Sequence, residues 1–216
     1  MEALPPPGTG YFVAPLTGPG PGVLLLPSAW GLTPSLKQRA DDLADSGFSV
    51  LAPDLNDGIV ATTVEEADEA LMAMDINVAA SLAQSSMRLL QRATADPTLP
   101  VGVVGFGAGA SWALWLSERM ANSCGCVITF YGTQSIEFSD ASAAYLLHFG
   151  TDDEVVDETD IAMLGLNLQL AGRAFDVVHH QNAKHGFAEA EHPNHDAAIE
   201  AVAWRQSLEF LATHLR

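Results

Sequence analysis

The segment Val101–Ser111, VGVVGFGAGAS, joins an apolar strand-like run to a helix-like segment through a glycine-rich turn. Glycines at such a corner let the chain turn sharply, because they adopt backbone angles that other residues avoid. Two kinds of site use this design. In a dinucleotide-binding turn the backbone approaches a pyrophosphate, whereas a nucleophile elbow holds one reactive side chain at its tip.

The dinucleotide hypothesis fits this chain less well. Its pattern, Gly105-x-Gly107-x-x-Ala110, normally opens a domain, but two strand-like runs and two helical segments come before it here. It also requires an acidic residue about 20 positions later, where this chain has Phe130–Gly132. We therefore favour a nucleophile elbow, in which Gly105 and Gly109 take the small positions and Gly107 takes the position of the nucleophile.

Apolar runs alternate with helical segments along most of the chain. The strand-like runs are Val23–Leu26, Phe48–Ala52, Val101–Val104, Cys126–Tyr131, Ala144–Phe149 and Phe175–His179. Apolar spacing, caps and stop signals predict helices over 33–47, 75–95, 108–120 and 158–171, and from Pro193 to Leu215. This alternation predicts an α/β fold with a mostly parallel, doubly wound sheet that carries helices on both faces.

Two segments depart from the alternation. The Pro- and Gly-rich residues 1–20 are expected to form an irregular lead-in, with an edge strand at Tyr11–Ala14. The acidic segment Leu55–Met74 has only weak helical signals and is expected to cover a cleft. A length of 216 residues suits a single domain.

Composition narrows the function classes and the location. A net charge of −18 makes contact with nucleic acid or an anionic membrane surface unfavourable. No apolar run reaches the roughly 18 residues that span a bilayer, and the N-terminus lacks the basic and apolar regions of a secretion signal. We therefore expect a cytoplasmic protein that binds neither nucleic acid nor membrane.

Several segments, in this order and spacing, resemble the dienelactone hydrolase family of the α/β-hydrolase superfamily, from about Pro21 to Leu215. The segments are LLLPSAWGLTPSLKQRADDLADSGFSVLAPDL, GFGAGASWALWLSERM, FYG, HFGTDDEVV, KHGF and AWRQSLEFL. The resemblance implies an α/β-hydrolase fold and the hydrolysis of lactones or small carboxylic esters. It places the family's Cys-Asp-His triad on Gly107, Asp153 and His185.

The chain departs from the family at two positions of the implied site. Gly107 has no side chain that can attack a carbonyl carbon. Ser28 stands where relatives of the founding enzyme carry a glutamate that interacts with the resting thiol. The backbone N–H groups of Ala108 and Ala29 are still expected to bind an oxyanion or carboxylate. Trp30, in the same loop, is expected to line the pocket or to pack in the core.

Other residues with reactive side chains are weaker candidates for the nucleophile. Ser111 lies one helical turn beyond the elbow and is expected to point into helix packing. Cys124 and Cys126 precede a strand, away from the strand ends where α/β sites form, and are expected to be structural. The resemblance implies that the loop of Ser28 faces the elbow, but we expect Ser28 to serve as a pocket hydroxyl.

Histidines close to the expected site invite a metal hypothesis. His192 and His195 are spaced by about one helical turn, but Pro193 lies between them and no Asp or Cys has the matching spacing. We expect no metal and no cofactor, and only His185 receives a role by position.

The sequence thus predicts a dienelactone hydrolase homologue with a degenerate triad. We expect little or no covalent hydrolase activity and a retained pocket for a small carbonyl or carboxylate ligand. One alternative is an enzyme without a nucleophile, a hydrolase, isomerase or cyclase in which His185 and Asp153 activate water or move a proton. Another is a non-catalytic binding or scaffold protein, for which a homodimer is compatible with the sequence.

Overall fold

A seven-stranded sheet forms the centre of the protein in the computed structural model, which describes residues 10–215. Its strands are β1 (Gly10–Val13), β2 (Gly22–Leu26), β3 (Ser49–Pro53), β4 (Val101–Phe106), β5 (Cys124–Phe130), β6 (Ala144–Gly150) and β7 (Phe175–His180). Their order in the sheet is β1-β3-β2-β4-β5-β6-β7. Only β1 runs antiparallel to its neighbour, so the prediction of a mostly parallel sheet is confirmed.

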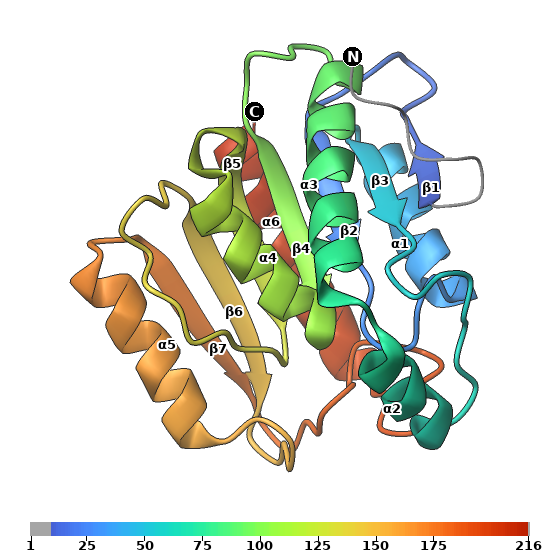
Figure 1. Ribbon diagram of the computed structural model, residues 1–216, viewed down its shortest axis with the longest axis vertical. Coiled ribbons are helices and arrows are strands. Elements are labelled where there is room, and N and C mark those ends of the chain that lie inside the picture. Colours follow the sequence, from blue (N-terminus) through green and yellow to red (C-terminus); the bar gives the residue numbers. More distant parts are fainter. Residues whose placement is uncertain (1–9, 216) are drawn as a thin grey trace.

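Helices cover both faces of this sheet (Figure 1). They are α1 (Pro34–Asp45), α2 (Val64–Ala73), α3 (Ile76–Ala93), α4 (Ala108–Arg119), α5 (Glu158–Leu170) and α6 (Ala197–Leu215). On one face, buried residues of α1 and α6 pack against β2, β3 and β4. On the other, α3, α4 and α5 close a second core. Because both faces are buried, the central strands are apolar along their whole length, and the doubly wound architecture is confirmed.

Local signals in the sequence account for most of the helix ends. The Thr33 side chain accepts a hydrogen bond from the N–H of Leu36, and Pro34 occupies the first turn of α1. Gly47, at φ +96°, follows the end of this helix. Asp75 caps α3 in the same way, by accepting from the N–H groups of Asn77 and Val78. The signals at Thr33, Pro34 and Gly47 predicted α1, whereas α3 was predicted from its apolar spacing and from the prolines that follow it.

One expected boundary needs correction, and the expected edge strand is confirmed to within one residue. The last helix begins at Ala197 and not at Pro193, because the Asp196 carboxylate caps it by accepting from the N–H groups of Ala198 and Ile199. Within the expected irregular lead-in, Gly10–Val13 forms the edge strand β1, while residues 1–9 lie outside the described part of the chain.

The acidic segment 55–74 contains α2, which lies against the end of the sheet where the parallel strands finish (Figure 1). Thr63 caps this helix, and Glu65 and Glu66 stand in its first turn, where negative charge is favourable. No helix within residues 10–215 combines the length and the hydropathy needed to cross a bilayer.

Candidate functional site

Gly107 forms a sharp corner between β4 and α4. Its φ of +49° and ψ of −115° lie in a region that side chains rarely adopt. The neighbouring glycines are required by close backbone contacts. A Cβ atom on Gly105 would lie 2.3 Å from the carbonyl oxygen of Gly109, and one on Gly132 would lie 2.4 Å from that of Gly107. The turn therefore has the compact shape expected of a nucleophile elbow.

The space next to Gly107 would accept a side chain. A Cβ atom built there would lie 3.4 Å from Cβ of Ser28, 3.9 Å from Nε2 of His185 and 4.0 Å from Cε2 of Tyr131. All three are ordinary van der Waals contacts, so a small side chain would fit and would face the imidazole. The geometry of the position suits a nucleophile, and only the side chain is missing.

Asp153 and His185 form a hydrogen-bonded pair. Asp153 follows β6, His185 follows β7, and Nδ1 of His185 lies 3.0 and 3.2 Å from the two carboxylate oxygens. Burial raises the pKa of Asp153, but the hydrogen bonds from His185 and from the N–H groups of Val155 and Val156 outweigh it and lower the pKa overall. A carboxylate in this place orients the imidazole and leaves Nε2 facing Gly107.

Backbone donors complete the surroundings of the turn. Ala108 is the first residue of α4, and the first N–H groups of a helix have no partner within it. Ala29 lies in the loop after β2, where its carbonyl oxygen accepts a hydrogen bond of 2.7 Å from Nδ2 of Asn56. Both residues line the same cavity as Gly107. Their placement suits the binding of a carbonyl oxygen or an oxyanion.

Glu189 is a member of the site that sequence reasoning missed. Its carboxylate is 6% exposed and accepts hydrogen bonds from Oγ of Ser28, at 2.5 Å, and from the hydroxyl of Tyr131, at 2.8 Å. Burial raises the pKa of Glu189, although the two hydroxyl donors act against this rise. Glu189 also lines the cavity, so it brings a buried carboxyl group to the site beside His185.

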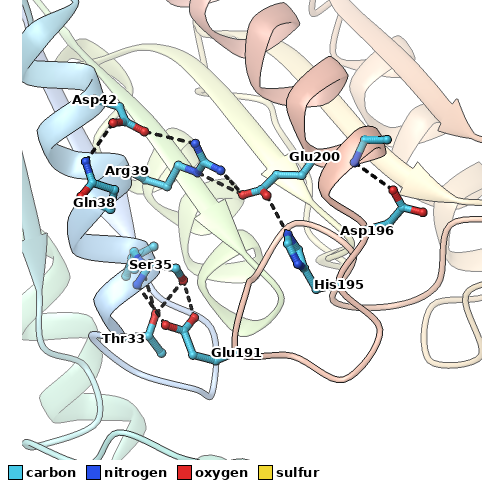
Figure 2. A network of polar contacts seen from close by, with 11 residues as sticks. Thr33, Ser35, Gln38, Arg39, Asp42, Glu191, His195, Asp196 and Glu200 are labelled. Atoms are coloured by element: carbon cyan, nitrogen blue, oxygen red, sulfur yellow. Dashed lines mark hydrogen bonds and ion pairs between the residues drawn. The ribbon is translucent and has the colours of Figure 1, made fainter.

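The loop 181–196, which carries His185 and Glu189, is fixed to α1 and α6 by a network of polar contacts (Figure 2). Glu191 accepts hydrogen bonds from the backbone N–H and the hydroxyl of Ser35, in the first turn of α1. His195 contacts Glu200 of α6, which also pairs with Arg39 of α1. Both contacts come after His185 in the chain, and they fix this part of its loop to α1 and to α6.

A cavity of about 840 Å³ lies at the ends of the parallel strands, and its lining includes Gly107, Tyr131, His185 and Glu189. Ser28, Gly107, Tyr131, Asp153 and His185 each follow the carboxyl end of a different strand, as expected for sites in open α/β sheets. On the far side the cavity is bounded by α2, including Val64, Ala67 and Leu71. The predicted covering role of the segment 55–74 agrees with this placement.

Trp30 and Ser111, two further residues considered in the sequence analysis, both line the cavity. Trp30 is 5% exposed and lines the cavity, where its ring packs against His192. The expectation that Ser111 points into helix packing is wrong, because it lines the cavity and its hydroxyl donates to the carbonyl oxygen of Thr133. Its position at the start of α4 turns it toward the strand ends.

The cysteines and most histidines take no part in the cavity. Cys124 and Cys126 are buried free thiols at the start of β5, and burial raises the pKa of Cys126 to about 12. A thiol with such a pKa is a poor nucleophile. Across residues 10–215, no group of three or more His, Cys, Asp or Glu side chains is arranged to hold a metal ion.

Comparison with known proteins identifies the family to which the chain belongs. The model of the dienelactone hydrolase family matches residues 9–215. The chain belongs to the dienelactone hydrolase family. The match includes the elbow and the loops of Asp153, His185 and Glu189, so the site described above lies within the family domain.

Individual relatives are distant but match along most of their length. A carboxymethylenebutenolidase of Rhodococcus opacus is 28% identical, over 92% of this chain and 83% of the relative. The crystal structure of the dienelactone hydrolase-like promiscuous phosphotriesterase P91, from metagenomic libraries, superposes with a TM-score of 0.81 at 24% identity. That superposition covers 97% of this chain and 95% of P91. Esterase 2 of Thermogutta terrifontis, phosphoramylated by tabun, gives a TM-score of 0.72 at 15% identity, over 94% and 88% of the two chains. At these identities the superpositions establish the α/β-hydrolase fold alone.

Proposed function

We propose that this member of the dienelactone hydrolase family binds a small carbonyl compound above Gly107 and has little or no covalent hydrolase activity. The observation that carries the proposal is the glycine itself, at a position whose Cβ would face Nε2 of His185 at 3.9 Å. Covalent ester hydrolysis needs a nucleophilic side chain at such a point, activated by an adjacent base. Here the base is present and the nucleophile is not.

The other parts of the site support binding of a carbonyl group. Ala108 and Ala29 line the cavity together with Gly107, and their N–H groups would donate hydrogen bonds to an oxygen atom of the ligand. The buried hydroxyl groups of Ser28 and Tyr131 are held by Glu189, which keeps this wall of the pocket in one arrangement. A pocket of about 840 Å³ is within the range that encloses small organic ligands.

A second function, in which the protein is an enzyme without a nucleophile, is favoured by the hydrogen bonds between Asp153 and His185. These bonds orient the imidazole as a base, and the space beside Gly107 is large enough to admit a water molecule or a ligand C–H group. In this mechanism Nε2 of His185 takes a proton from that water or C–H group, without an acyl-enzyme intermediate. Loss of a native turnover in His185→Ala would support this function, and indifference to that change would exclude it.

Hydrolysis of 4-nitrophenyl acetate distinguishes the two functions. We expect the native protein to match the buffer rate. The Gly107→Cys variant should hydrolyse the ester, and the double variant Gly107→Cys/His185→Ala should lose roughly 100-fold of this rate, because general base catalysis contributes about that much. A folded Gly107→Cys variant without activity would contradict the proposal, as would turnover by the native protein. Native turnover that is lost in His185→Ala would favour the second function.

A further inference from the structure

The wall of the cavity formed by α2 and its surroundings is largely apolar. Side chains from α2, from the segment after it, from α4 and from the loop after β6 contribute to this wall. The members are Val64, Leu71, Met74, Ile76, Trp112 and Val155. Burial of an aliphatic or aromatic group against these side chains would be favourable, because it removes apolar surface from water on both partners.

The charges around the cavity are negative. None of the residues that line it, within the described part of the chain, is lysine or arginine. Its acidic members are Asp68 of α2 and Glu189, and its other ionisable members are Tyr131, His185 and His192. Lys184 precedes His185 in the chain but does not line the cavity. A carboxylate that entered would lose its hydration without gaining a lysine or arginine partner, and it would be repelled by Asp68 and Glu189.

Two of the arginines are held away from the cavity by their own contacts. Arg39 pairs with Glu200 and Asp42, between α1 and α6 (Figure 2). Arg173 donates to the carbonyl oxygens of Ala141 and Ala171, near the beginning of β7 and so at the opposite end of that strand from His185. With only 9 basic residues against 27 acidic ones in the whole chain, the field of the protein also disfavours an approaching anion.

We propose that the pocket selects uncharged esters, lactones or related carbonyl compounds with an apolar acyl group, and that it excludes compounds bearing a carboxylate. This inference rests on the proposed function, since it assigns the substrate class of the same pocket. The sequence predicted a carbonyl or carboxylate ligand, and this proposal retains only uncharged carbonyl compounds. We assign the exclusion of anionic compounds to Asp68, because it is the one carboxylate among the otherwise apolar α2 residues that line the cavity.

The test uses a matched pair of amide probes that the protein is not expected to hydrolyse. Hexanamide and 6-amino-6-oxohexanoate have the same six-carbon chain and the same amide, but one ends in a methyl group and the other in a carboxylate. Dissociation constants for the native protein would be measured by ligand-observed NMR. We expect hexanamide to bind at least about tenfold more tightly, a difference of about 1.4 kcal/mol. Equal or tighter binding of the anionic probe would overturn the inference and leave the proposed function standing.

Charge reversal on α2 provides the matched variants. Asp68→Arg should reduce the preference for hexanamide at least about fivefold, whereas Glu69→Arg should leave it nearly unchanged. Glu69 is a suitable control because it is an exposed neighbour on the same helix that does not line the cavity, and it gives the same change in net charge. An equal effect of the two variants would contradict a local role of Asp68.

Turnover by the Gly107→Cys variant separates this inference from the proposed function. We expect it to hydrolyse 4-nitrophenyl hexanoate at least about tenfold faster, in kcat/KM, than the 4-nitrophenyl monoester of adipic acid. If hexanamide binds but the variant hydrolyses neither ester, the account of the missing nucleophile fails and the specificity stands. If neither amide binds the native protein, the pocket does not hold carbonyl compounds, and both proposals fail together.

Discussion

Ser28 donates a hydrogen bond of 2.5 Å to Glu189, across 161 positions of the sequence. Ser28 lies in the loop after β2, and Glu189 lies in the loop that carries His185. The same carboxylate accepts from Tyr131, which follows β5. Three loops are therefore connected through one buried carboxylate, next to the space where a nucleophile would stand.

Replacement of Glu189 should destabilise the protein. In Glu189→Ala the hydroxyl groups of Ser28 and Tyr131, both at most 5% exposed, lose their acceptor. A buried polar group left without a partner costs about 1–3 kcal/mol, so we expect a comparable loss in the free energy of unfolding, measured by urea denaturation. Glu189→Gln keeps one acceptor oxygen and should lose less. An alanine variant as stable as the native protein would show that these bonds do not hold the loops.

The backbone angles of Gly107 predict a cost for any side chain there. At a φ of +49° and a ψ of −115°, Gly107→Ala should lower the free energy of unfolding by about 1–3 kcal/mol, without a steric clash. Gly165→Ala is the matched control. Gly165 lies within α5, and an added Cβ would contact only the ring of Phe175, at 3.6 Å, so this variant should gain up to about 1 kcal/mol. Equal effects of the two substitutions would refute backbone strain at the elbow.

A buried histidine pair predicts how stability depends on pH. His148 of β6 is fully buried, with Nδ1 3.1 Å from Nε2 of His180 and Nε2 3.2 Å from Oγ of Ser207. Burial, together with the nearby His180, lowers the pKa of His148 to about 3. In the unfolded chain this pKa is about 6.5. The stability that the neutral imidazole contributes is therefore present above pH 6.5 and is lost as the pH falls toward 3.

Protonation of His148 alone should lower the free energy of unfolding by about 2 kcal/mol between pH 7 and pH 5. Its measurement is the difference in unfolding free energy between the native protein and His148→Gln at each pH. This difference removes the opposite contribution of Glu189, whose raised pKa favours the folded state at low pH in both proteins. His179→Gln, on the exposed side of β7, should change the pH dependence little. A His148→Gln variant with the native pH profile would contradict this account.

The fold could be predicted from the sequence because its signals are local. Continuous apolar runs mark strands that are buried on both faces, and Thr33, Pro34 and Gly47 mark the ends of α1. Asp153 and His185 were identified through the family resemblance, and each follows a strand end where parallel sheets collect functional residues. The start of α6 was misplaced because Asp196, which caps it, stands among other polar residues that gave no distinct signal.

Glu189 could not be found in this way. Acidic residues are common in this chain, and nothing in the local sequence shows that this one is buried. Its burial depends on hydroxyl donors from two loops that are distant in sequence, and only the folded chain brings them together. The orientation of Ser111 was missed for a similar reason, because its partner is the carbonyl oxygen of Thr133. Its distance of one turn from the elbow did not indicate which side it faces.

The most direct test of the central claim is intact-protein mass spectrometry after mixing with an activated ester. We predict that the Gly107→Cys variant gains one acyl group in a reaction that depends on His185, and that peptide mapping places this group at position 107. The native protein should gain no His185-dependent acyl group under the same conditions. A stoichiometric adduct on the native protein, for example on Ser28, would show that covalent catalysis persists without a side chain at Gly107, and it would contradict the account.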